Sequence, residues 1–143
     1  MLVKHILSEK GREVVSVARE ATLSEAARLL AHRRIGAVVV RDGGDGVAGI
    51  LSERDIICAL ADQSVNALAQ SVAQHMTQRV VTCRETDAVE DLMELMTRKR
   101  FRHIPVMEDG RLAGIVSIGD IVKSRIAETM AEAESLRGYI AAG

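Results

Sequence analysis

A serine followed three residues later by an aspartate occurs twice in this chain, each time between an apolar, strand-like segment and a helix-like one. The two copies read GILSERD over Gly49–Asp55 and GIVSIGD over Gly114–Asp120. A strand-to-helix junction points backbone N–H groups and the positive end of the helix dipole outward, which makes a site for phosphate. The serine hydroxyl can donate to that phosphate, and the aspartate can accept hydrogen bonds from the vicinal hydroxyls of a ribose.

The same residues also fit a purely structural role. Ser52 and Ser117 are good helix N-caps, and an acidic residue three positions later resembles a capping box. Asp55 and Asp120 are shorter than the usual Glu or Gln, so we expect them to reach back poorly to the N-cap N–H. Because the junction occurs twice, with a glycine three residues before the serine both times, we interpret it as a ligand site.

The two junctions belong to an internal repeat with an offset of about 66 residues. Each unit is predicted to run strand, helix, strand, strand, helix, which gives an α+β fold made of two β-α-β-β-α units. The expected strands cover residues 15–17, 37–40 and 47–51 in the first unit and residues 81–83, 104–107 and 112–116 in the second.

We expect four segments after the N-terminus. They are a first repeat over residues 11–63, a mostly helical connector over 64–76, a second repeat over 77–125 and a C-terminal helix over 126–143. An additional short helix is predicted near the N-terminus, over residues 2–7. The C-terminal helix is rich in Ala and Glu, which suits a solvent-exposed face, although Ile126, Met130 and Leu136 also fit a packing edge.

The composition argues against nucleic acid, metal and catalysis. The net charge is −1 and the chain has one Phe, one Tyr and no Trp, so it lacks both a basic field and aromatic platforms for bases. The four histidines show no metal-ligand spacing, so no metal site is predicted. We find no P-loop, no GxGxxG motif and no nucleophile–base pair, and we predict that the protein is not an enzyme.

The sequence also indicates a cytoplasmic location. It has no signal peptide, and no apolar run approaches the ~20 residues that a membrane span requires. Cys58 and Cys83 do not form a CxxC motif, and we expect both to be buried free thiols rather than a disulfide.

The repeat, its two Ser-x-x-Asp junctions and the run RFRHIPV over Arg100–Val106 resemble the cystathionine β-synthase (CBS) domain family, over about residues 11–125. The resemblance implies two units packed about a pseudo-twofold axis, with two clefts that bind an adenosine nucleotide such as AMP, ADP, ATP or NAD(H). It also implies a homodimer and a regulatory, sensing function exerted on an unknown partner protein. The alternative is a constitutive dimerisation module without a physiological nucleotide.

The resemblance also assigns roles to individual residues. Asp55 and Asp120 would contact ribose hydroxyls, and Ser52 and Ser117 would contact ribose or phosphate. The strands at residues 15–17 and 81–82 would enclose the adenine, and they contribute Ser16, Val81 and Thr82.

The two halves differ where the resemblance places phosphate. The second unit has Arg102, His103 and Pro105 where the first has Gly36, Ala37 and Val39. Arg and His supply hydrogen-bond donors for phosphate, whereas the first unit has only Arg54, placed in its junction. We therefore predict a complete site in the second half and a weaker one in the first.

Overall fold

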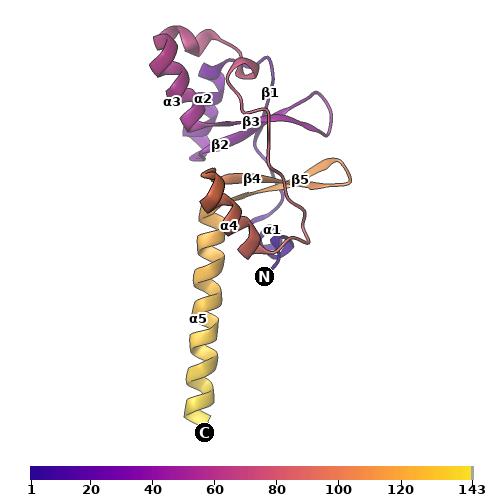
Figure 1. Cartoon of the computed structure of the whole chain (residues 1–143), viewed down its shortest axis with the longest axis vertical. Helices are drawn as coiled ribbons and strands as arrows, with labels where there is room; N and C mark the ends of the chain where they lie inside the picture. Colours follow the sequence, from indigo (N-terminus) through magenta and orange to yellow (C-terminus); the bar gives the residue numbers. More distant parts are fainter. Residues whose placement is uncertain (143) are drawn as a thin grey trace.

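The predicted order of elements is present in both units, with one exception in the second, and the α+β class is confirmed (Figure 1). The computed structural model describes residues 1–142. The first unit consists of β1 (Ser16–Ala18), α2 (Leu23–Arg33), β2 (Ala37–Arg41), β3 (Val47–Ser52) and α3 (Glu53–Gln63). The second consists of α4 (Val89–Lys99), β4 (His103–Glu108), β5 (Arg111–Ser117) and α5 (Ile118–Ala142).

The exception is the predicted strand over residues 81–83. In the first unit the Val39 N–H donates to Val15 O at 3.2 Å, which extends the parallel pairing of β1 with β2. The counterpart of Val39, 66 residues on, is Pro105, which has no N–H to donate. Only Cys83 still bridges to β4, where its N–H donates to Pro105 O at 3.0 Å. The prediction of a strand here is therefore wrong, and the second sheet has two strands.

The segments outside the repeats complete the two hydrophobic cores. The predicted N-terminal helix is α1 (Val3–Lys10), and Val3, Ile6 and Leu7 are buried in the core of the second unit. The predicted helical connector forms two 3₁₀ helices, η1 (Ser64–Ala69) and η2 (Val72–Gln74), which pack on the first unit. Each unit is thus completed by the segment that precedes the other unit in sequence.

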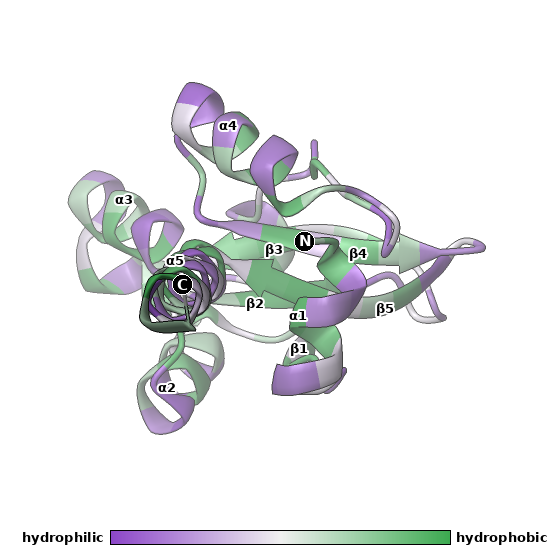
Figure 2. Ribbon diagram, turned by 90° about the horizontal axis from the view of Figure 1, so that it is seen from below, coloured by the Kyte–Doolittle hydropathy of each residue, from purple (hydrophilic) through white to green (hydrophobic). Residues whose placement is uncertain are grey.

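Contacts join the two units at two places, beside the starts of β2 and β4 and at the ends of the two hairpins. The Arg102 guanidinium lies 3.4 Å from the Glu53 carboxylate. At Gly36 a Cβ would lie only 3.2 Å from the His103 ring, so the absence of a side chain there lets the ring approach. At the hairpin ends, the Leu112 N–H donates to the Asp45 carbonyl at 3.2 Å. Figure 2 shows the strands as the hydrophobic layer, with polar residues on the helices around it.

The two cysteines are free, as predicted, but they differ in exposure. Burial is the main cause that raises the pKa of Cys83 to about 12, and the carboxylates of Asp87 and Glu108 add to it. The Cys58 side chain is exposed, so the prediction that it is buried is wrong. Cys58 lies at a position on α3 that faces away from the core residues Ile56 and Ala59.

Candidate functional site

Both Ser-x-x-Asp junctions are capping boxes. The Ser52 N–H donates to Asp55 Oδ2 at 2.9 Å, and the Asp55 N–H donates to Ser52 Oγ at 3.2 Å. The matching distances between Ser117 and Asp120 are 2.8 and 3.2 Å. The expectation that aspartate reaches back poorly is therefore wrong, because each serine N-cap brings its own N–H within reach of the shorter side chain.

The capping bonds leave part of each carboxylate available. Within residues 1–142, the hydrogen bonds to Asp55 all fall on Oδ2, which accepts from the N–H and the hydroxyl of Ser52. Its Oδ1 keeps its lone pairs for another donor. A capping role and a ligand role are thus compatible in the same side chain.

The glycines upstream of the junctions have a packing explanation. A Cβ at Gly49 would lie 2.7 Å from the backbone oxygen of Thr77, and one at Gly114 would lie 2.7 Å from the Leu7 side chain. Both glycines lie on the strands that the connector and α1 cover. Their repetition, which the sequence analysis used as support for a ligand site, follows from this close approach instead.

A cleft of about 550 Å³ opens between the two units beside the first junction. This volume lies within the range of sites for small molecules and cofactors. The first unit contributes Ala37, Ile50, Ser52, Arg54 and Asp55, and the second contributes Thr77, Arg79, Val80, Val81, Arg100, Phe101, Arg102 and His103. The cleft therefore combines a ribose-type carboxylate, apolar side chains and a group of cations from both repeats.

The cations dominate the charge of this cleft. Four arginines line it, Arg54, Arg79, Arg100 and Arg102, against one carboxylate, Asp55. Arg102 is paired with Glu53 at 3.4 Å, whereas none of the other three guanidinium groups has an ion pair within residues 1–142. Guanidinium groups bind phosphate oxygens through paired N–H donors, so this cleft favours an anionic ligand.

Arg100 is positioned by the end of α4. It terminates the helix in the left-handed conformation, with φ 62°, and its N–H donates to Met96 O at 2.8 Å. The equivalent residue of the first unit, Arg34, ends α2 in the same way, with φ 55°. Of the basic residues between 98 and 102, Arg100 and Arg102 line the cleft.

His103 is a neutral group in this cleft. Burial lowers its pKa below the ordinary value, and the neighbouring Arg102 guanidinium lowers it further. The ring is thus uncharged near neutral pH and can donate one hydrogen bond and accept another.

The second junction has an intramolecular partner that the sequence did not indicate. Lys10, the last residue of α1, donates to Asp120 Oδ2 at 2.7 Å and to the Ile115 carbonyl at 2.9 Å. Burial alone would raise the pKa of Asp120, but the hydrogen bonds from Lys10 and Ser117 hold it below the ordinary value. The carboxylate that was predicted to serve the stronger site is thus already neutralised by the chain itself.

This ion pair predicts an acid-sensitive contribution to stability. Because the pKa of Asp120 is lower in the folded state, the contribution is complete above the unfolded-state pKa near 4 and is lost as the pH falls through the folded-state pKa. Lys10→Met is expected to lower the free energy of unfolding by about 1 kcal/mol at neutral pH and by less near pH 3. Urea unfolding at both pH values measures this. Lys4→Met, on the same helix and without an ion pair within residues 1–142, is the control, and an equal loss at both pH values would contradict the assignment.

The predicted site residues are divided among several places. Ser52, Arg54, Asp55, Ala37, Val81, Arg102 and His103 line the cleft. Ser117 and Asp120 lie at the second junction with Lys10, and Pro105 is buried within β4. Ser16 accepts a hydrogen bond from Arg41 at 3.2 Å, and Thr82 lines a hollow beside the second hairpin, so neither belongs to the cleft.

The cleft thus pairs the first junction with donors of the second unit. From the sequence, Arg102 and His103 were predicted to act with Ser117 and Asp120, because they belong to the same repeat. Arg79 and Thr77, which line the cleft from the segment that precedes Val81, were not predicted. A motif in one repeat and the residues that line the cleft from the other share no sequence spacing that would have revealed them.

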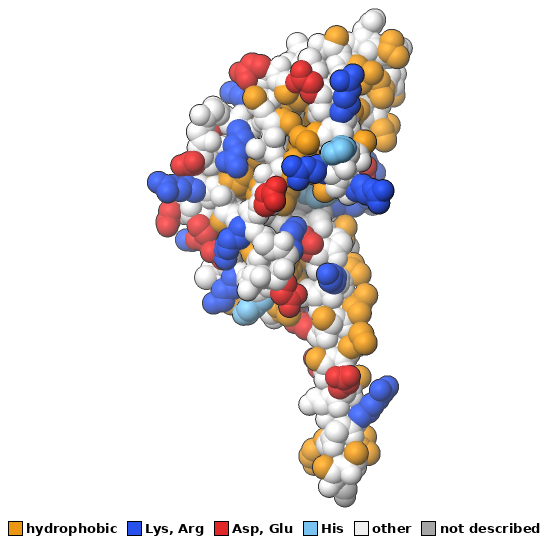
Figure 3. Space-filling model, turned by 180° about the vertical axis from the view of Figure 1, so that it is seen from behind, with side chains coloured by type: hydrophobic (Ala, Val, Ile, Leu, Met, Phe, Trp, Pro, Cys, Tyr) orange, Lys and Arg blue, Asp and Glu red, His pale blue; other side chains and the backbone are white. Residues whose placement is uncertain are grey.

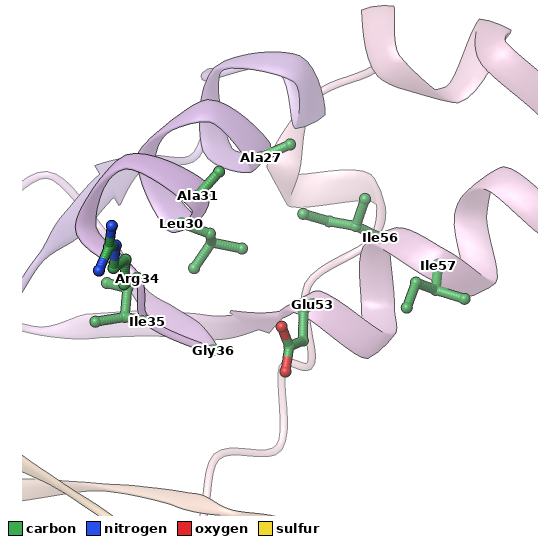
Figure 4. A pocket seen from close by; sticks show the side chains of 9 residues that line it. All are labelled: Ala27, Leu30, Ala31, Arg34, Ile35, Gly36, Glu53, Ile56 and Ile57. Atoms are coloured by element: carbon green, nitrogen blue, oxygen red, sulfur yellow. The ribbon is translucent and has the colours of Figure 1, made fainter.

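Gly36 lines a different, shallower groove between α2 and α3. Figure 4 shows Leu30 and Ile56 directed toward each other across this groove, with Ala27 above them and Glu53 at the lower rim. Its lining is mainly apolar, and only Arg34 and Glu53 are charged. It thus carries one guanidinium group, that of Arg34, where the cleft has four.

Among residues 1–142, no group of three or more His, Cys, Asp or Glu side chains is arranged to hold a metal ion. Over the same residues, none of the helices combines the length and hydrophobicity needed to cross a bilayer.

Comparison with known proteins gives one consistent result. The family model described as "CBS domain" matches residues 3–62 and 71–127. The CBS domain-containing protein CBSX3, mitochondrial, of Arabidopsis thaliana is 34% identical over 126 residues, which are 85% of this chain and 61% of that protein. The chain thus spans about three fifths of that relative.

Two solved structures show the same fold. The CBS-domain containing protein ATU1752 of Agrobacterium tumefaciens superposes with a TM-score of 0.85 at 50% identity, covering 87% of this chain and 99% of that one. The CBS domain protein PAE2072 of Pyrobaculum aerophilum, solved in complex with AMP, has a TM-score of 0.74 at 32% identity. The alignment with it covers 84% of this chain and 89% of that one.

Proposed function

Because this chain belongs to the CBS domain family, we propose that it is a non-catalytic regulatory module that binds an adenosine nucleotide in the cleft beside Ser52 and Asp55. The observation that carries the proposal is the composition of that cleft, in which one ribose-type carboxylate, apolar walls and four arginines surround a volume of about 550 Å³. The AMP complex of PAE2072 supports an adenosine ligand.

The side chains suggest how such a ligand lies. Asp55 Oδ1 accepts hydrogen bonds from the ribose hydroxyls while Oδ2 keeps its capping bond to Ser52. The adenine packs between Ile50 and the Val80–Val81 segment, which provide the apolar walls. The phosphates then point toward the arginines, and His103 supplies a neutral hydrogen bond.

The arginines favour a ligand with more than one phosphate. A single phosphate monoester carries up to two negative charges, whereas three guanidinium groups, those of Arg54, Arg79 and Arg100, have no ion pair within residues 1–142. Each further phosphate brings charge and acceptor oxygens that these side chains can bind. We therefore expect ADP and ATP to bind more tightly than AMP.

Binding would act on the packing of the two units. The cleft is lined from both repeats, and at its edge the units are joined by the exposed pair of Arg102 and Glu53. An exposed ion pair contributes little to holding the units together. A ligand that contacts both units therefore shifts the equilibrium between two packing arrangements of the units, by the difference in its affinity for the two arrangements. The output would pass to a partner protein or to a second copy of the chain.

A second function stays in contention because of the capping boxes. The hydroxyl oxygens of Ser52 and Ser117 each accept a hydrogen bond from the aspartate N–H of the same junction, and capping the helix is a sufficient structural role for both serines. In that case the protein would be a constitutive dimerisation module, and the cleft would bind no physiological nucleotide.

Isothermal titration with a graded set of ligands tests these statements. Affinity is expected to rise by about tenfold from adenosine to AMP and again from AMP to ADP, with S-adenosylmethionine, which carries a cationic sulfur, below AMP. Arg79→Gln and Arg100→Gln are expected to reduce the ADP-to-AMP ratio, whereas Arg28→Gln, an exposed arginine of α2, should leave it unchanged. Equal affinity for AMP and ADP would contradict the phosphate assignment, and no binding of any of these ligands would favour the second function.

A further inference from the structure

Helix α5 extends far beyond the body of the protein. It has 25 residues, and Figure 1 shows its C-terminal part projecting without a neighbour among the elements of its own chain. The face that contacts the body includes Ile121, Ser124 and Glu128, and from residue 129 to residue 142 every residue is exposed. A helical segment of about 14 residues is marginal by itself in water, so this part of α5 needs stabilisation from outside its own body.

A stripe of apolar side chains runs along α5 on a face that the body does not use. Its exposed members are Val122, Ile126, Met130, Leu136 and Ile140, which are 50, 55, 64, 61 and 68% exposed. Figure 3 shows hydrophobic side chains gathered along one edge of the projecting helix.

The stripe has the spacing of a coiled coil. Ile126, Ala133 and Ile140 repeat every seven residues, and Val122, Thr129 and Leu136 repeat every seven residues between them. These are the a and d positions of a heptad. The a positions hold Ile126, Ala133 and Ile140 and the d positions hold Val122, Thr129 and Leu136. Ile at a beside Leu at d, the pattern that favours two parallel strands, therefore occurs in the C-terminal part of the stripe, at Leu136 and Ile140.

The charged residues beside this stripe are complementary in a parallel pair. In this register Glu132 occupies a g position and Arg137 the following e position, which meet across a parallel two-stranded interface. By symmetry the pair forms twice. In an antiparallel pair centred on Met130, Arg137 would instead oppose Lys123 of the other copy, and the like charges would repel.

We propose that α5 pairs with α5 of a second copy of this chain in a parallel two-stranded coiled coil along Val122–Ile140. The inference does not depend on nucleotide binding in the cleft. The partner is an identical helix, because the apolar stripe of one copy fits the same stripe of another and Glu132 of one copy is complementary to Arg137 of the other.

The apolar groove of the first unit supports the same arrangement. It lies between α2 and α3. In Figure 2, seen from below, these two helices stand on either side of α5, to the same side of the strands. Ile57 on its rim is 64% exposed. A twofold axis parallel to α5 would therefore place the two grooves opposite each other while the helices pair, and a single interface would cover both apolar surfaces.

Sedimentation of the full chain over a concentration series tests the proposal. The wild type is expected to be a dimer, and Ile126→Glu is expected to weaken dimerisation by at least about tenfold, because it places like charges in the centre of the seam. Val65→Glu is the control, since Val65 is 73% exposed and lies on η1, away from the stripe. A monomeric wild type, or a dimer equally sensitive to both changes, would overturn the proposal. Circular dichroism of each variant separates loss of pairing from loss of fold.

Two further variants test the parallel direction. Glu132→Arg and Arg137→Glu should each weaken the dimer by about threefold or more, and the double exchange should restore it. These residues are five apart and do not meet on one helix, so such a rescue reports a contact between copies. Leu136→Cys in a Cys58→Ser background should form an intermolecular disulfide under mild oxidation, because the two d positions meet only in a parallel pair. A stable dimer with no cross-link and no rescue would overturn the parallel arrangement.

Discussion

Asp55→Asn is expected to weaken ADP binding by about ten- to a hundredfold while leaving the fold intact. The proposed role of Asp55 is to accept hydrogen bonds from the ribose hydroxyls, and the loss of one hydrogen bond to a charged acceptor costs about 1.5–3 kcal/mol, which corresponds to this range of affinity. Asparagine keeps one carbonyl oxygen, which can still accept the Ser52 N–H, now at 2.9 Å from the carboxylate. The change thus removes the charge and one acceptor without removing the helix cap. Isothermal titration of ADP measures the affinity, and thermal unfolding without ligand checks the fold.

Asp120→Asn is the matched control for this experiment. It has the same capping geometry, with the Ser117 N–H at 2.8 Å, but its carboxylate is bound by Lys10 and does not line the cleft. Its effect on ADP affinity is expected to stay below about threefold, since no charge–ligand contact is lost. The two changes were predicted from the sequence to rank the other way. Equal losses, or a larger loss from Asp120→Asn, would therefore contradict the assignment of the cleft to the first junction.

The different ranking proposed from the structure follows from what a repeated sequence can and cannot predict. The order of elements followed from apolar periodicity, and the repeat supported each assignment twice, so only the segment at residues 81–83 differed. No strand forms there because Pro105 lacks the N–H that, at Val39 of the first unit, extends the parallel pairing. The presence of that proline was known, but its pairing partner was not.

The residues of the candidate site were harder to predict because the cleft forms between the repeats. Sequence comparison groups Arg102 with Ser117, since both belong to the second unit, whereas the fold places Arg102 beside Ser52 and Asp55. Lys10 is 110 residues from Asp120 and lies in a helix outside the repeat, so no spacing links them. Residue types predicted the chemistry of the cleft, and only the packing of one unit on the other determined which residues share it.

The second large effect is expected at Gly49. A Cβ there would lie 2.7 Å from the Thr77 backbone oxygen and 2.8 Å from Met76 Sδ. Thr77 cannot move freely, because its N–H and carbonyl are both hydrogen-bonded to Ile50, at 2.9 and 3.0 Å. Gly49→Ala is therefore expected to destabilise the protein by about 1–3 kcal/mol, the usual cost of overpacking. Denaturant unfolding measures this value.

Two glycines provide the comparison for that measurement. A Cβ at Gly114 meets only the Leu7 side chain, which can change rotamer, so Gly114→Ala should cost less than Gly49→Ala. Gly119 lies in the first turn of α5, where the nearest atom, Ser117 Oγ, is 3.6 Å away, and Gly119→Ala should be neutral or stabilising by up to about 1 kcal/mol. Similar losses from Gly49→Ala and Gly119→Ala would show that backbone approach is not the constraint at residue 49.

Gly49→Ala is expected to affect the cleft as well as the stability. Thr77 lies on the cleft wall and begins the segment that leads to Val80 and Val81, so a shift of its backbone displaces the surface proposed to contact adenine. ADP affinity should therefore fall with Gly49→Ala but not with Gly114→Ala, even at a temperature where both variants are folded. Unchanged affinity in the Gly49 variant would mean that the Thr77–Val81 wall adapts independently of β3, and that the adenine contacts lie elsewhere in the cleft.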